Sequence, residues 1–95
     1  MVTLPLQPGQ AMRLAKTVKF REEKYGGVLF ETQSEQVFTL SESASAIVRE
    51  IGLGGDEQAV TARLKSQFDP RDGQAIEREV KALVADLRQR GLIED

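Results

Sequence analysis

The change of hydrophobic period at residue 41 constrains the fold of this chain more than any other feature. Before it, the segment GGVLFETQSEQVFTL, residues 26–40, contains two short runs rich in β-branched and aromatic residues around the polar turn QSEQ. After it, apolar residues recur at the three- and four-residue spacing of helices. The sequence therefore predicts a β-hairpin followed by helices.

Three strands are expected before the helices. Val18 and Phe20 alternate with charged residues, which predicts a strand over residues 16–22 with one buried face. The hairpin then supplies two more strands, VLFET at residues 28–32 and QVFTL at residues 36–40. Because consecutive strands usually pair with each other, we expect the first strand beside the second and the third on the outside.

Three helices are expected after the hairpin. Ser41, Asp56 and Asp69 are the predicted N-caps, and Pro70 stands at the favoured first position of the third helix. That helix is expected to run to about Arg90, with Gly91 ending it in a left-handed conformation. The apolar stripes are Ala44, Ile47, Val48 and Ile51 in the first helix, Val60, Leu64 and Phe68 in the second, and Ile76, Val80, Leu83, Val84 and Leu87 in the third.

Length and composition indicate one compact domain. The chain has 95 residues, of which 40% are hydrophobic, enough for a single core shared by one sheet face and three helical stripes. The predicted class is α+β, with a winged-helix-like order of a three-stranded antiparallel sheet followed by three helices. Residues 1–14 carry prolines and a glycine without a sustained period, so we expect a mobile arm there and the folded domain over residues 15–95.

The residue types present argue against catalysis. The chain has no Cys and no His, which removes thiol nucleophiles, disulfides and the usual general base. The glycines of GLGGD follow a helix rather than a strand, and DPRDGQAIE fits a helix start better than a calcium loop. We therefore expect no enzyme activity, no cofactor and no metal. The N-terminal residues do not resemble a signal peptide and no apolar run could span a bilayer, so a cytoplasmic protein without membrane contact is expected.

A winged-helix DNA regulator is the alternative that strands with three helices suggest. The net charge is −2, and the cations of the third helix are nearly balanced by its acids, so it presents no basic face to phosphates. A nucleic-acid partner is therefore not expected.

The outer strand of the hairpin is the most informative element. QVFTL has no charge, proline or other visible device that would blunt an exposed sheet edge. An extended peptide could add to it as a further strand, with main-chain hydrogen bonds supplying affinity. The alternative is that the third helix or a second copy of the chain covers this edge. Hydrophobic periodicity favours neither interpretation over the other.

Three stretches of the chain resemble the PqqD-like family of peptide-recognition proteins. They are YGGVLFETQSEQVFTLSESASAIVREI, GGDEQAVTARLKSQFD and the closing LVADLRQRGLIE, and the resemblance extends over about residues 18–94. The resemblance implies a recognition element that binds the leader of a ribosomally made precursor peptide and presents it to a modifying enzyme. In the founding case that enzyme is a radical-SAM protein and the product is pyrroloquinoline quinone.

The resemblance also implies a peptide site and a set of partners. The leader would add to the third strand beside the third helix, which places the site at Val37, Phe38, Thr39 and Leu40 on the strand and at Lys81, Val84, Leu87 and Arg88 on the helix. The expected partners are the leader peptide and a radical-SAM maturation enzyme. Without peptide, the open strand or the N-terminal arm offers two routes to a homodimer.

Overall fold

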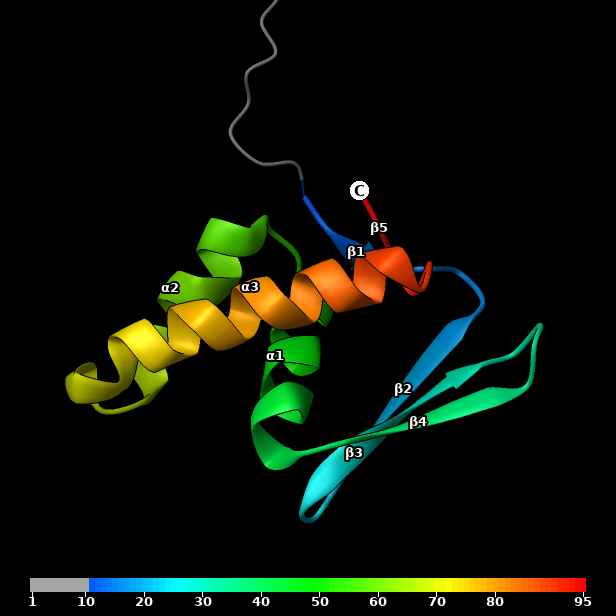
Figure 1. The fold of residues 1–95 in the computed structure, drawn as a ribbon, viewed down its shortest axis with the longest axis horizontal. Coiled ribbons are helices and arrows are strands. Elements are labelled where there is room, and N and C mark those ends of the chain that lie inside the picture. Colours follow the sequence, from blue (N-terminus) through cyan, green and yellow to red (C-terminus); the bar gives the residue numbers. More distant parts are fainter. Residues whose placement is uncertain (1–10) are drawn as a thin grey trace, which may run out of the picture.

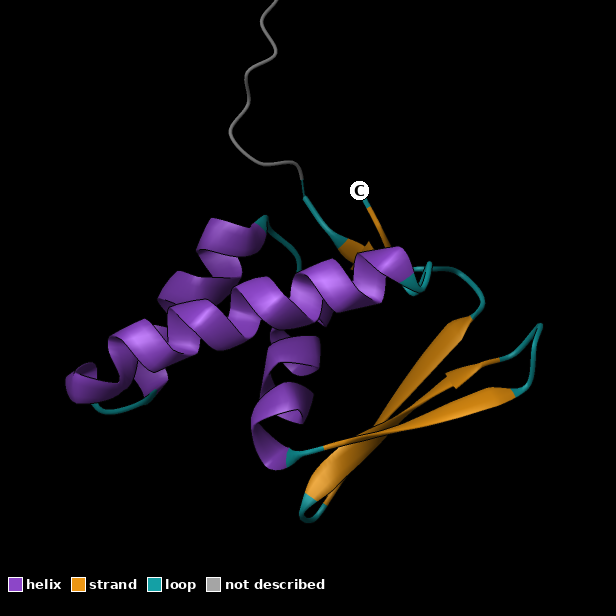
Figure 2. Cartoon of the chain, viewed as in Figure 1, coloured by secondary structure: helices purple, strands orange, loops and turns teal. Residues whose placement is uncertain are grey.

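The computed structural model describes residues 11–95, which form a twisted antiparallel sheet beside a group of three helices (Figures 1 and 2). A second, two-residue strand pair joins the beginning and the end of the described chain. The elements in chain order are β1 (Arg13–Leu14), β2 (Val18–Glu23), β3 (Gly26–Glu31), β4 (Gln36–Leu40), α1 (Glu42–Gly52), α2 (Glu57–Gln67), the 3-10 turn η1 (Pro70–Asp72), α3 (Gly73–Gln89) and β5 (Ile93–Glu94). The predicted α+β class and the order of sheet before helices are confirmed.

The main sheet has the strand order β2-β3-β4, with both neighbouring pairs antiparallel. β4 has the predicted bounds of residues 36–40. β2 starts two residues later than predicted, because Ala15 to Val18 form a turn closed by a 3.0 Å hydrogen bond from the Val18 N–H to the Ala15 carbonyl. β3 starts two residues earlier than predicted, at Gly26.

A glycine allows α1 to pack closely against the central strand. A Cβ on Gly27 would lie 2.6 Å from the Ser45 hydroxyl oxygen and 2.9 Å from the Phe20 ring. The Ser45 hydroxyl, which is buried, donates a 3.1 Å hydrogen bond to the Gly26 carbonyl. The sheet and α1 are therefore held at one fixed separation, directly after the point where β4 runs into α1.

The helix ends follow the sequence signals, with one difference. Ser41 and Asp56 cap α1 and α2, accepting hydrogen bonds from the N–H groups of Ala44 and Ala59. Asp69 does cap a helix with Pro70 at its first position, but that helix is the short turn η1, and α3 begins only at Gly73. The reason is that the Asp69 carboxylate satisfies the N–H of Arg71, a turn tighter than an α-helical cap.

The end of α3 is closed as predicted. Gly91 has a φ of 73°, and its N–H donates to the Arg88 carbonyl at 3.0 Å. The next N–H, of Leu92, reaches back to the Leu87 carbonyl at 2.9 Å, and both leucine side chains are buried. This pair of hydrogen bonds is the Schellman arrangement, in which the last carbonyls of the helix are satisfied and a hydrophobic contact covers them.

The strand pair β1–β5 was not predicted, and it corrects the boundary of the expected arm. Residues 1–10 lie outside the described residues. Arg13 and Leu14, however, pair with Glu94 and Ile93, and Met12 is buried in the core. The folded body therefore begins before residue 15. A two-residue strand has too short a pattern to be recognised in a sequence.

One core connects all the helices with the inner face of the sheet. It contains Met12, Val18, Leu29, Ile47, Val48, Ile51, Val60, Leu64, Val80, Val84, Leu87, Leu92 and Ile93. Within residues 11–95, none of the helices combines the length and the apolar composition that crossing a membrane requires.

A buried carboxylate ties α1 to α2. Glu50 is only 2% exposed, and its carboxylate accepts hydrogen bonds from Arg63 at 2.8 Å and from Gln67 at 3.2 Å. The Arg63 guanidinium also donates to the carbonyls of Glu50 and Gly54. Burial raises the pKa of Glu50, but the bonds from Arg63 and Gln67 and the charges of Arg63 and Arg49 outweigh it and hold the pKa below its usual value.

Candidate functional site

The outer edge of β4 is open in the part of the chain that the structure describes. β4 pairs with β3 on one side, and no described strand pairs with it on the other. An unpaired edge exposes main-chain donors and acceptors that can accept another extended segment. The prediction that this strand lies at the edge of the sheet is confirmed.

The register identifies which main-chain groups of β4 point outward. Thr32 donates to the Thr17 carbonyl at 2.9 Å, so Thr17 and Thr32 form a hydrogen-bonded pair of the β2–β3 ladder. Such pairs alternate along an antiparallel ladder, and a residue that bonds one neighbouring strand is followed by one that bonds the other. In β4, residues 36, 38 and 40 therefore bond to β3, while Val37 and Thr39 direct their N–H and C=O groups outward.

The side chains of β4 divide between two faces of the sheet. Phe38 and Leu40 are half-buried and pack against the core. Val37 is 60% exposed and Thr39 is also exposed. A segment added to β4 would thus find an apolar face on the helix side and a solvated face on the other.

A hollow lies where α3 crosses α1, and we call it the α1–α3 hollow. Its volume is about 300 Å³ and its lining is mainly apolar: Ala44, Ile47, Glu79, Ala82, Leu83 and Asp86. In Figure 1 the sheet and the C-terminal half of α3 extend to the same side of α1. At the end of α3, the Arg90 guanidinium lies 5.4 Å from the centre of the Phe38 ring and also pairs with Asp86 at 3.1 Å. This contact connects α3 with the open strand.

The helix residues predicted for the site do not share one exposed surface. Val84 and Leu87 are buried in the core, at 1% and 3% exposure. Lys81 lines a surface hollow between α2 and α3, and Arg88 pairs with Asp95 at 2.7 Å, next to β5. A helical period shows that a stripe has two flanks but not which of them faces the sheet, so the assignment of these four residues to the peptide site stays a prediction.

The flank of α3 that does lie toward β4 carries Glu79, Leu83, Asp86 and Arg90. These positions are spaced by three or four residues and therefore share one helix face. The contact between Arg90 and Phe38 connects this face of α3 to the strand half of the predicted site, Val37 to Leu40. Asp86 and Arg90 form an acid–base pair four residues apart, and this spacing is the sequence signal that could have indicated this face.

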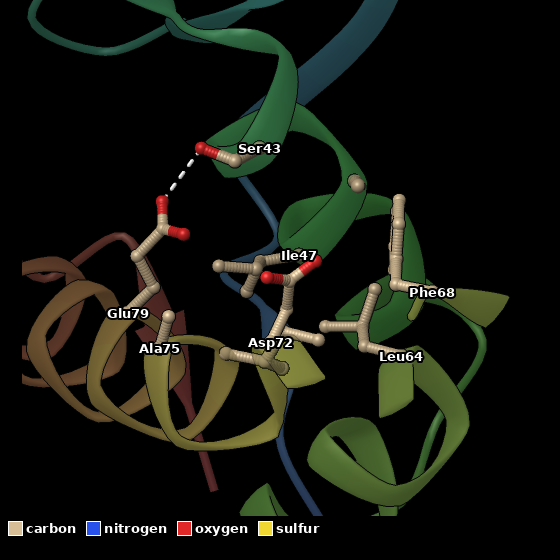
Figure 3. A pocket seen from close by; sticks show the side chains of 9 residues that line it. Ser43, Ile47, Leu64, Phe68, Asp72, Ala75 and Glu79 are labelled. Atoms are coloured by element: carbon tan, nitrogen blue, oxygen red, sulfur yellow. Dashed lines mark hydrogen bonds between the residues drawn. The ribbon is translucent and has the colours of Figure 1, made fainter. Parts of the chain in front are cut away.

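A second hollow lies on the other side of the α1 N-terminus, and we call it the Phe68 hollow (Figure 3). Its volume is about 220 Å³. It is lined by Ser43, Ala46, Ile47, Leu64, Phe68, Asp72, Ala75, Ile76 and Glu79. The Ser43 hydroxyl donates a 2.6 Å hydrogen bond to the Glu79 carboxylate at its rim, and Ile47 and Glu79 line both hollows.

Comparison with known proteins places this arrangement in a family. The family model described as coenzyme PQQ synthesis protein D (PqqD) matches residues 26–93, from the first residue of β3 to β5. The chain belongs to the PqqD family. The resemblance seen in the sequence is therefore confirmed, and the matched region contains both β4 and α3.

Solved structures share the fold of this PqqD-family chain. One, described as lasso peptide synthetase B1 complexed with the leader peptide, has a TM-score of 0.72 and 26% identity, covering 88% of this chain and 98% of that one. Another, TbiB1 in complex with the TbiA(beta) leader peptide, has a TM-score of 0.74 and 18% identity, covering 86% and 94%. A search of curated proteins by sequence finds no match.

Proposed function

We propose that this chain is a non-catalytic adaptor that binds the leader segment of a ribosomally made precursor peptide as an added strand on β4. The observation that carries the proposal is the outward direction of the Val37 and Thr39 main-chain groups along an unpaired edge. A guest strand would make its hydrogen bonds there, and such bonds give affinity without reading a sequence.

Selectivity would come from the helix side. Alternate side chains of a guest strand point to the same face as Phe38 and Leu40, toward the apolar floor formed by Ala82 and Leu83. In the proposed site, Val37, Phe38, Thr39 and Leu40 form the strand wall. The helix wall is formed by Glu79, Leu83, Asp86 and Arg90, in place of the residues predicted from the sequence.

The comparisons support a leader peptide as the guest. The lasso peptide synthetase B1 and TbiB1 structures are both complexes with leader peptides, and each covers more than four fifths of this chain. We propose that the adaptor holds the precursor close to its processing enzyme, so that the reaction between them proceeds at a high effective concentration.

Two classes of enzyme are candidates for that partner. Membership of a family described by coenzyme PQQ synthesis favours a radical-SAM enzyme and a quinone-type product. The 26% identity with a lasso peptide synthetase B1 favours the processing machinery of a lasso peptide instead. Co-purification of the tagged chain from its own cells, with identification of the bound enzyme by mass spectrometry, distinguishes the two.

Proline substitutions along β4 test strand addition directly. Proline removes one N–H group, so Val37→Pro and Thr39→Pro each delete an outward donor, whereas Phe38→Pro deletes a bond to β3. The probes are peptides enriched on the parent protein from a displayed library of random sequences. We expect the two outward variants to keep the parent's circular dichroism and to lose at least tenfold in peptide affinity, measured by fluorescence polarisation.

Matched variants separate the main-chain effect from the side-chain effect. Val37→Ala keeps the outward N–H and should bind within about threefold of the parent, since the Val37 side chain is mostly solvated. Phe38→Pro should lose the hairpin and Phe38→Ala should keep it. Folded Val37→Pro and Thr39→Pro variants that bind the peptides as well as the parent would rule out strand addition, as would failure to enrich any peptide.

A further inference from the structure

The Phe68 hollow has the features of a binding pocket for one apolar side chain. Its wall is formed mainly by apolar residues from all three helices, and Phe68 at its edge remains 50% exposed. An exposed aromatic side chain that continues an apolar depression forms a contiguous apolar patch, which is typical of a binding groove. Figure 3 shows the Phe68 ring on one side of the opening and the bridge between Ser43 and Glu79 on the other.

The Phe68 hollow lies close in the chain to the end of β4. β4 ends at Leu40, Ser41 caps α1, and Ser43 stands in the first turn of α1 at the rim of the hollow. Ile47 and Glu79 line the Phe68 hollow on one side and the α1–α3 hollow on the other. The two depressions are therefore neighbours that share Ile47 and Glu79.

The rim of the Phe68 hollow is acidic. Asp72 and Glu79 both line it, and among residues 11–95 neither carboxylate forms an ion pair with a Lys or Arg. Carboxylates close to an apolar depression favour a ligand in which a cationic group stands next to an apolar one.

We infer that the peptide bound on β4 continues past Ser43 and places a second apolar side chain, next to a Lys or Arg, in the Phe68 hollow. This inference rests on the proposed strand addition and extends it to a two-part recognition. The β4 edge would supply main-chain hydrogen bonds that every peptide can make. The Phe68 hollow would supply the choice among peptides, because only a segment with an apolar anchor at the right separation fills it.

Filling the hollow from its own wall tests the inference. Ala75 is an exposed residue of α3 that lines the Phe68 hollow, so Ala75→Trp would occupy the pocket without burying a new group in the core. Ala85 is also an exposed alanine of α3 but lines neither hollow, so Ala85→Trp is the matched control. The probes are peptides enriched on the parent from a displayed random library, each long enough to cover β4 and both hollows.

We expect Ala75→Trp to weaken the enriched peptides at least tenfold and Ala85→Trp to change affinity less than threefold. Shortening a peptide residue by residue from one end should abolish its sensitivity to Ala75→Trp at the residue that fills the hollow. Asp72→Asn with Glu79→Gln should weaken peptides with a basic residue beside that anchor more than the same peptides with Gln there.

The possible outcomes separate this inference from the proposed function. If Val37→Pro abolishes binding while Ala75→Trp binds like the parent, strand addition stands and the second anchor is wrong. If Val37→Pro has no effect, strand addition itself is wrong. If Ala75→Trp leaves peptide affinity unchanged but lowers self-association in sedimentation, the Phe68 hollow belongs to a contact between copies, and the inference is overturned.

Discussion

The end of α3 and the edge of β4 are treated in opposite ways by the same chain. After α3, Gly91 and Leu92 satisfy the last carbonyls of the helix, and β5 then pairs with β1. Within residues 11–95, no buried side-chain donor or acceptor lacks a partner. β4, which is longer than β1 or β5, keeps its outer edge unpaired in the described chain. The end of α3 and the short strands β1 and β5 thus have their main-chain groups paired. The unpaired edge of β4 differs from them, although β4 is the longer strand.

Contacts of β4 with its neighbours explain why its unpaired edge can keep one conformation. β4 is bounded by β3 and runs directly into α1, and α1 is fixed against β3 through Gly27 and against α2 through Glu50. A strand held in this way is already extended before a peptide arrives. Less conformational entropy is then lost on binding, which increases affinity.

The largest expected effect is the difference in unfolding free energy lost by truncating a side chain in the central strand β3 and one in the outer strand β4. Leu29 in β3 is fully buried, so Leu29→Ala should leave a cavity and lower the free energy of unfolding by about 3 kcal/mol. Val37→Ala in β4 should lower it by less than about 1 kcal/mol, since that side chain is mostly solvated. Urea denaturation followed by circular dichroism measures both. Equal losses would show that β4 is not an open edge in solution.

The next largest effect is expected at Glu50, the buried carboxylate that ties α1 to α2. Glu50→Gln should lower the free energy of unfolding by about 2 kcal/mol at pH 7, because Arg63 and Arg49 lose the buried carboxylate. The folded-state pKa of Glu50 is lowered, so its contribution is present above the unfolded pKa and is lost as the pH falls through the folded pKa. The difference between parent and variant should therefore shrink in acid.

A surface pair provides the control for Glu50. Glu77→Gln removes a carboxylate that pairs with Lys65 where both side chains are substantially exposed, so the loss should stay below about 0.5 kcal/mol. Unfolding curves at several pH values between neutral and acid measure both variants. A Glu50→Gln loss that is independent of pH would show that its charge does not hold α1 to α2.

The sequence was sufficient for elements whose signals are local. The bounds of β4, the caps at Ser41 and Asp56 and the Schellman end at Gly91 were each predicted from a few neighbouring residues and were confirmed. These features depend on hydrogen bonds between residues close in the chain, which is why residue types alone indicate them.

The sequence was insufficient where distant segments meet. The β1–β5 pair joins residues about 80 positions apart, and neither two-residue strand has a period to detect. The side of α3 that faces β4 depends on the crossing of α3 over α1, which the sequence positions of Lys81 and Arg88 do not show. Half of the candidate site, the strand, was therefore predictable, and the helix half required the tertiary packing.

The smallest expected effect lies at the contact between Arg90 and Phe38, which joins the end of α3 to β4. The Arg90 guanidinium stands over the Phe38 ring at 5.4 Å and pairs with Asp86, so the end of α3 reaches the open strand. An exposed cation–π contact contributes about 0.5–1 kcal/mol and an exposed ion pair less. Arg90→Ala should therefore lower the free energy of unfolding by no more than about 1 kcal/mol.

A double-mutant cycle isolates that contact from the ion pair. In a Phe38→Leu background the ring is gone, so Arg90→Ala should lower the free energy of unfolding less than it does in the parent, by about 0.5 kcal/mol. Arg71→Ala, which removes only an exposed pair with Asp69, serves as the comparison in urea denaturation. Equal losses for Arg90→Ala in both backgrounds would mean that the end of α3 is not fastened to β4. The open strand would then be positioned by β3 and α1 alone.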